Sequence, residues 1–97
     1  MTVGLGCGRK VVAAAGTRVR LESSKREVAG VIITAETGTV ANTGYITVGD
    51  VTVIGADATR IGHPLAAGDS LPLYGVDLYE VWIDATVTGD GVTYIYW

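Results

Sequence analysis

Short apolar runs separated by glycine-containing turns constrain what this chain can fold into. Fourteen of the 97 residues are glycine, and they fall between runs rich in Val, Ile, Thr and Tyr. Such runs favour β-strands, because β-branched and aromatic side chains pack well on a pleated, half-buried surface. No window of useful length repeats its apolar residues with the 3.6-residue period of an amphipathic helix. The sequence therefore predicts an all-β fold.

The apolar runs predict eight short strands. Residues 17–21 show the alternation of a half-buried strand, because Val19 and Leu21 alternate with basic residues. Residues 70–75 contain Pro72, which cannot donate to a ladder, so this strand is expected at a sheet edge or a bulge. The strands are expected at about residues 10–14, 17–21, 28–36, 45–49, 51–55, 70–75, 78–87 and 92–97, with 58–62 as a weaker candidate.

Many short strands without a helix are typical of a β-sandwich or a barrel. We expect an eight-stranded, jelly-roll-like β-sandwich, with an immunoglobulin-like sandwich and a small barrel as alternatives. Residues 1–8 lack a strand pattern and predict a flexible N-terminal arm, followed by a single β-sandwich domain at 9–97. The predicted core consists of Val19, Leu21, Val31, Ile33, Val81, Ile83, Val92 and Tyr94.

The last two predicted strands carry large apolar residues on a side that water would occupy. In 79–87 one face is apolar, and Trp82 stands between two acids on the other. In 92–97 neither face is polar, because Ile95 and Trp97 occupy the side opposite the core. A strand that is apolar on both sides needs cover on both sides, from a loop or a second subunit. Trp82, Ile95 and Trp97 are therefore the predicted subunit interface.

Composition and charge also indicate association with other proteins. The chain is 48% hydrophobic and 18% charged, against about 25% charged in typical soluble domains. Residues 1–27 carry a net charge of +4 and residues 28–97 a net charge of −7. The basic residues are too few, and too little mixed with aromatic residues, for nucleic acid to be the expected partner. No stretch reaches the roughly 18–20 apolar residues of a membrane span, and residues 1–8 lack the pattern of a signal peptide.

The sequence offers little reactive chemistry. His63 is the single histidine, and Cys7 the single cysteine, so neither a multi-histidine metal site nor an internal disulfide is expected. The aspartates beside glycine suit turns, and the spacing of a calcium loop is missing. We predict no catalytic residue, no metal and no cofactor. A small hydrolase is a third alternative, which requires His63 in a cleft beside a serine or an acid.

Four motifs occur in order along the second half of the chain: NTGYITVGD at 42–50, GHPLAAGDSLPL at 62–73, DLYEVWI at 77–83 and GDGVTYIYW at 89–97. In this order they resemble a group of small proteins encoded near the capsid genes of tailed bacteriophages. The resemblance covers about residues 40–97, and residues 1–39 carry none.

The resemblance implies a virion structural protein, namely a capsid decoration (cement) protein on the outer surface of the head. Such proteins commonly form homotrimers that bridge subunits of the major capsid protein. The basic residues Arg9, Lys10, Arg18 and Arg20 are predicted to meet an acidic capsid surface, because the rest of the chain is acidic. The alternative is a receptor- or carbohydrate-binding module of a phage tail or fibre, with Trp82 or Trp97 as a stacking platform for sugar.

Overall fold

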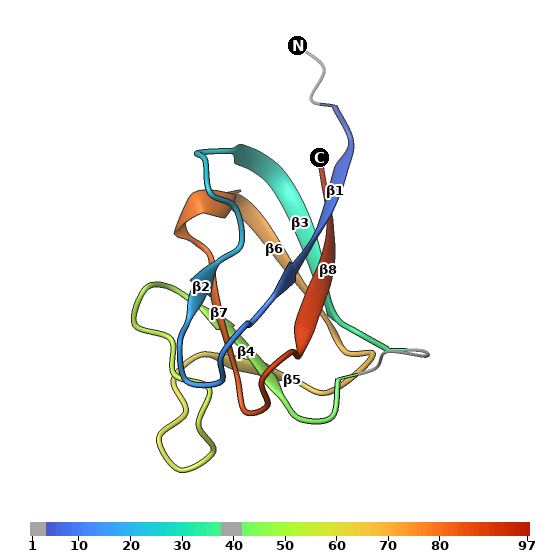
Figure 1. Cartoon of the computed structure of the whole chain (residues 1–97). Coiled ribbons are helices and arrows are strands. Elements are labelled where there is room, and N and C mark those ends of the chain that lie inside the picture. The colour runs from blue at the N-terminus through green and yellow to red at the C-terminus, as the bar shows by residue number, and fades with distance from the viewer. Residues whose placement is uncertain (1–3, 38–41) are drawn as a thin grey trace.

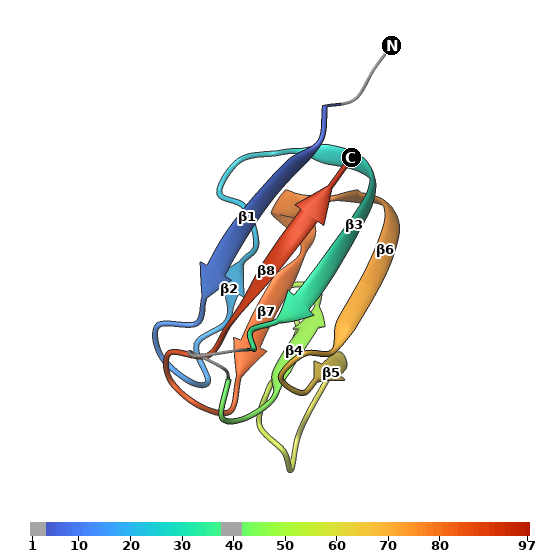
Figure 2. The same cartoon turned by 90° about the vertical axis from the view of Figure 1, so that its right-hand side faces the viewer.

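The computed structural model describes residues 4–37 and 42–97 and consists of two four-stranded antiparallel sheets. Sheet A has the strand order β1-β8-β3-β6 and sheet B the order β2-β7-β4-β5. Figure 1 shows the two layers from the side, and in Figure 2 sheet A lies in front of sheet B. The elements are β1 (Gly6–Val11), β2 (Val19–Arg20), β3 (Glu27–Ala35), β4 (Ile46–Gly49), β5 (His63–Leu65), β6 (Ser70–Asp77), the 3₁₀ helix η1 (Leu78–Glu80), β7 (Trp82–Ala85) and β8 (Gly91–Tyr96).

The predicted eight-stranded β-sandwich is confirmed. The first strand pairs with the eighth, the second with the seventh, the third with the sixth and the fourth with the fifth, and the pairs 3–8 and 4–7 complete the sheets. These pairings build the two sheets of the sandwich, and the jelly-roll-like connection stays a prediction.

The first strand begins earlier than the sequence predicts. Gly6 and Gly8 belong to β1 and lie opposite Tyr96 and Tyr94 of β8. A Cβ atom on either glycine would overlap the ring of the tyrosine opposite. The glycines therefore leave room for two aromatic rings at the edge of the core. The prediction that the flexible arm extends to residue 8 is wrong, because β1 begins at Gly6. Residues 1–3 of that arm lie outside the described residues.

One predicted strand, 51–55, and the beginning of another, 78–87, are replaced by other structure. Residues 78–80 form η1, and Asp77 caps this helix by accepting a hydrogen bond from the backbone N–H of Tyr79 at 2.9 Å. Residues 51–55 form no strand, and Ile54 makes a single bridge to Ile61. A helical turn and a loop of this kind have no period-2 pattern of their own. The apolar residues of 51–55 and 78–80 therefore predict strands that the structure does not contain.

The segment 50–62 packs on the outer side of sheet B. Val53 is only 1% exposed, and its side chain lies against Gly49 and Gly62. The backbone N–H of Gly55 donates to Asp84 at 2.9 Å. Asp84 was predicted to face water, yet it is 3% exposed, because this segment covers the outward side of β7.

The core prediction is largely confirmed. Seven of the eight predicted residues are buried, and Val19 is partly buried against the same cluster. Ile46, Leu65 and Leu78 complete the cluster from β4, β5 and η1. The structure contains no helix, within the residues it describes, that is long and apolar enough to cross a membrane.

Candidate interaction surface

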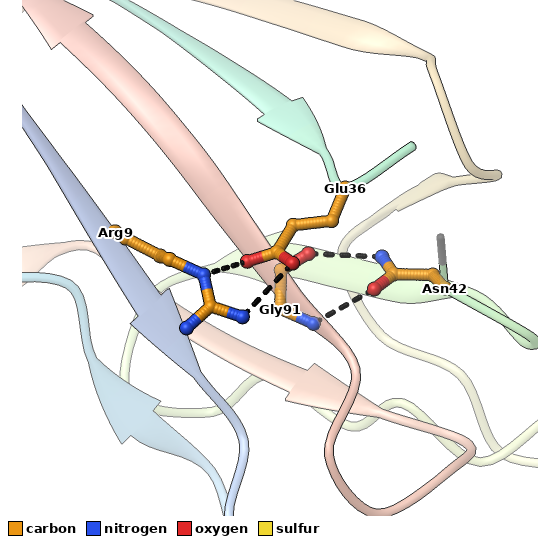
Figure 3. Close-up of polar contacts among 4 residues, drawn as sticks. All are labelled: Arg9, Glu36, Asn42 and Gly91. Atoms are coloured by element: carbon orange, nitrogen blue, oxygen red, sulfur yellow. Dashed lines mark hydrogen bonds and ion pairs between the residues drawn. The ribbon is translucent and has the colours of Figure 1, made fainter. Parts of the chain in front are cut away.

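A cluster of polar residues joins β1, β3, β8 and the turn that precedes β4 (Figure 3). The Asn42 side chain donates to the carbonyl of Gly91 and accepts from its N–H, both at 2.9 Å. Arg9 forms a two-bond ion pair with Glu36, with Nε–Oε1 at 2.5 Å and Nη2–Oε2 at 3.0 Å. Glu36 and Asn42 are buried, so their polar atoms need these partners.

The motifs behind the phage resemblance serve the fold. The carboxylate of Asp90 accepts hydrogen bonds from the backbone N–H groups of Thr43 and Gly44 at 3.2 and 2.9 Å. Together with the bonds of Asn42, these contacts join the NTG turn to the GDG turn. In the GHPLAAGDS motif, Gly68 has φ +88°, and Asp69 accepts from the N–H of Ala66 at 3.0 Å. The glycine, asparagine and aspartate residues of these motifs therefore specify turns, and other residues provide the candidate binding surface.

The four predicted basic contact residues do not form one patch. Arg9 lies on the outer face of sheet A, in register with Thr93. Arg20 lies beside Trp82 on the outer face of sheet B, with its guanidinium 3.8 Å from the ring centre of Tyr79 and 4.4 Å from that of Trp82. Of the other two, Lys10 is half-buried in β1 and Arg18 is exposed before β2.

The three predicted interface residues are also divided between the two sheets. Trp82 lies on sheet B, where Arg20 covers one face of its ring. Ile95 lies on the outer face of sheet A, and Trp97 packs over Gly30 on the same face, where any Cβ atom would overlap the indole. The structure therefore brings Ile95 and Trp97 together and separates both from Trp82.

The outer face of sheet A carries a continuous row of apolar side chains. Cys7 lies opposite Ile95, Ile95 opposite Ile32, and Ile32 opposite Pro72. Tyr74 meets Trp97 edge to face, with ring centres 6.5 Å apart. We call these residues the apolar face: Cys7, Ile32, Pro72, Tyr74, Ile95 and Trp97.

The apolar face is open to solvent, unlike the outer side of sheet B. Tyr74 is 70% and Ile95 40% exposed, whereas Val53 and its segment cover sheet B. Ile32, Pro72 and Tyr74 were not among the predicted interface residues. The alternation in 70–75 could have identified two of them, because Leu71 and Leu73 point inward and Pro72 and Tyr74 point outward. Ile32 could not be assigned to a face, because β3 is apolar on both sides.

His63 lies at the rim of a cavity of about 450 Å³ between the edges of the two sheets. Asp50, Asp77 and Glu80 line the same cavity. Among the described residues that line it there is no Ser, Thr or Cys to act as a nucleophile. Over residues 4–37 and 42–97 no three His, Cys, Asp or Glu side chains gather as a metal site would require.

Two backbone N–H groups hold the carboxylate of Asp77. Hydrogen bonds from Arg26 and Tyr79, each at 2.9 Å, favour its ionised form and lower its pKa, and the nearby charge of Lys25 acts in the same direction. Folding lowers this pKa below the unfolded value of about 3.9. The resulting stabilisation is therefore present above that value and is lost as the pH falls through the folded-state pKa.

We expect Asp77→Asn to lower the free energy of unfolding at pH 7 and to have a smaller effect at pH 3. At pH 3 the carboxyl is largely protonated in the unfolded state, whose pKa is about 3.9, so part of the stabilisation that comes from the lowered folded-state pKa is already lost. Urea unfolding of both proteins at the two pH values measures the difference. An equal difference at pH 7 and pH 3 would contradict the assignment.

No protein-family model and no curated protein sequence matches this chain. The resemblance to phage proteins therefore stays a hypothesis that rests on the four motifs.

Proposed function

We propose that this chain is a structural protein of a tailed-phage virion: a decoration protein that binds the outer surface of the head and bridges major capsid protein subunits. The observation that carries the proposal is the apolar face of sheet A. A domain of 97 residues that leaves Tyr74 and Ile95 exposed beside Trp97 has a surface suited to another protein. The four motifs and their resemblance supply the phage context.

We propose a homotrimer as the working form, with the apolar face covered by a neighbouring copy. A closed ring of copies would cover this face without leaving an open edge for continued growth. Trp82 is a weaker candidate for the contact, because Arg20 already covers one side of its ring.

The basic residues keep a secondary role in this proposal. Arg9 and Arg20 already have partners in Glu36 and the two aromatic rings. Exposed Arg18 is therefore the basic residue that we expect to guide approach to an acidic capsid surface. Single exposed ion pairs contribute only about 0–1 kcal/mol, so such charges orient a complex more than they hold it together.

The test is electron cryomicroscopy of virions of the phage that encodes the chain, produced with and without it. We expect three-fold density on the outer surface of the head that is missing from particles without the protein. Ile95→Asp should lower the occupancy of this density, because it places a charge in the covered apolar face. Heads that lack the protein should release their DNA at a lower temperature.

Val87→Asp is the matched control. Val87 is 37% exposed and lies in the turn between β7 and β8, outside the apolar face. The density of the Val87→Asp variant on the head should therefore have the same occupancy as that of the wild type. Density on the tail or fibres instead of the head would overturn the decoration proposal in favour of the receptor- or carbohydrate-binding alternative.

A further inference from the structure

The cavity between the sheet edges arises because the two edge strands differ in length. β6 runs for eight residues, whereas β5 in sheet B runs for three. Leu71, Leu73 and Val76 project inward from β6 and are only partly buried against the core. They form an apolar floor in the cavity of about 450 Å³, which we call the edge slot. The volume is in the range of sites that enclose a ligand group.

The rim of the edge slot is acidic. Its lining includes Asp50, Asp77 and Glu80, and, within the part of the chain that the structure describes, the only basic side chain in that lining is His63. Hydrogen bonds lower the pKa of Asp50, chiefly those donated by the side chain and backbone of Thr52. Two backbone N–H groups do the same for Asp77. The carboxylates therefore place negative charge beside the apolar floor of the edge slot.

A second depression of about 490 Å³ continues from the slot, because Asp50 and Glu80 line both. Its other lining residues are Arg20, Lys25, Val51, Tyr79 and Trp82. We call these two adjoining depressions the groove: it has apolar side chains in the edge slot, the shared acids Asp50 and Glu80, and aromatic side chains beside Arg20 and Lys25 in the second depression. A groove of this form fits an extended chain better than a single compact molecule, since successive side chains of an extended peptide reach successive parts of it.

We propose that the groove binds an extended peptide segment of a partner protein that carries a large aliphatic residue followed within two positions by Lys or Arg. The aliphatic side chain fills the edge slot against Leu73, and the basic side chain pairs with Asp50 and Glu80. The apolar floor selects the first side chain by burial, and the acidic rim selects the second by charge complementarity. The inference rests on the proposed function in that a decoration protein must hold a second protein.

The experiment is selection of a random heptapeptide display library on the immobilised full chain, followed by NMR titration with the synthetic consensus peptide. We expect a consensus with Leu, Ile or Met close to Lys or Arg. Its methyl shift changes should lie at Leu71, Leu73 and Val76. Glu80→Lys should weaken binding about tenfold, because it replaces an attraction by a repulsion.

Asp57→Lys is the control for the same change of charge. Asp57 lies in an exposed loop outside both depressions, so this variant should bind the peptide within about twofold of the wild type. A library that yields no consensus, an acidic consensus, or shift changes away from the edge slot would overturn the proposal. Concentration-dependent shifts of the slot methyls without peptide would also overturn it, because they would assign the slot to a second copy of the chain.

Virion imaging separates this proposal from the proposed function. Density on the head together with a failed peptide selection would leave the decoration function standing and remove the groove as its contact. A selected peptide bound at the slot, together with density on the tail, would keep the groove and overturn the decoration function.

Discussion

Ile83→Ala should lower the free energy of unfolding by about 2–5 kcal/mol, the usual cost of removing a fully buried aliphatic side chain. Ile83 is 0% exposed in β7 and lies between Val19 of β2 and Val48 of β4. Alanine would leave a cavity between these strands and the facing sheet. Urea unfolding followed by tryptophan fluorescence measures the loss, with the slope of the transition checked for two-state behaviour.

Ile95→Ala is the matched control for this prediction. It removes the same atoms from β8, but Ile95 is 40% exposed on the apolar face, so the monomer should lose less than about 1 kcal/mol. Dilute protein is needed, so that self-association does not contribute to the difference. A loss well under 1 kcal/mol for Ile83→Ala would mean that the faces of β7 are inverted, as a shift of one residue in register would cause.

Asp84→Ala should cost about 2–5 kcal/mol, although a carboxylate in the sequence suggests a surface position. The Asp84 carboxylate accepts hydrogen bonds from the N–H groups of Gly16, Gly55 and Ala85 at 3.1, 2.9 and 2.8 Å. Each donor left buried without a partner costs about 1–3 kcal/mol. The change also releases the segment 50–62, which Asp84 ties to sheet B through Gly55.

Asp84→Asn is the control that keeps the shape of the side chain and one acceptor oxygen, and its loss should be smaller than that of alanine. Hydrogen exchange adds a readout specific to the contact. The amide of Gly55 should lose protection in Asp84→Ala before the amides of β3 do, because local release of the segment precedes global unfolding. Equal stability of both variants and the wild type would show that the carboxylate does not hold the segment.

Much of the fold follows from local pattern in the sequence. Alternation of side chains in 17–21 and 92–97 identifies Leu21, Val92 and Tyr94 as core residues, because successive side chains of a strand point to opposite faces. Glycine and aspartate mark turns for steric and hydrogen-bonding reasons that need no distant partner. These rules act over a few residues, so a single sequence suffices to apply them.

Other features depend on contacts between residues far apart in the chain. Gly8 belongs to a strand because it pairs with Tyr94 of β8, whose ring fills the space that a Cβ atom would take. Asn42 is buried because it pairs with Gly91, 49 positions away. Strand order places Arg9 and Arg20 on different sheets, although only ten residues separate them.

The candidate surfaces were predicted only in part. The sequence by itself determined that the chain is an all-β protein and that Ile95 and Trp97 share a face that needs cover, because period-2 alternation is a property of each strand alone. Only the tertiary structure decided that Ile32, Pro72 and Tyr74 join them, that Trp82 does not, and that an acid-rimmed slot opens between β5 and β6. The physical reason is that neighbours across a sheet, and gaps between sheets, are set by strand order, register and relative strand length, and none of these is encoded in any single short segment.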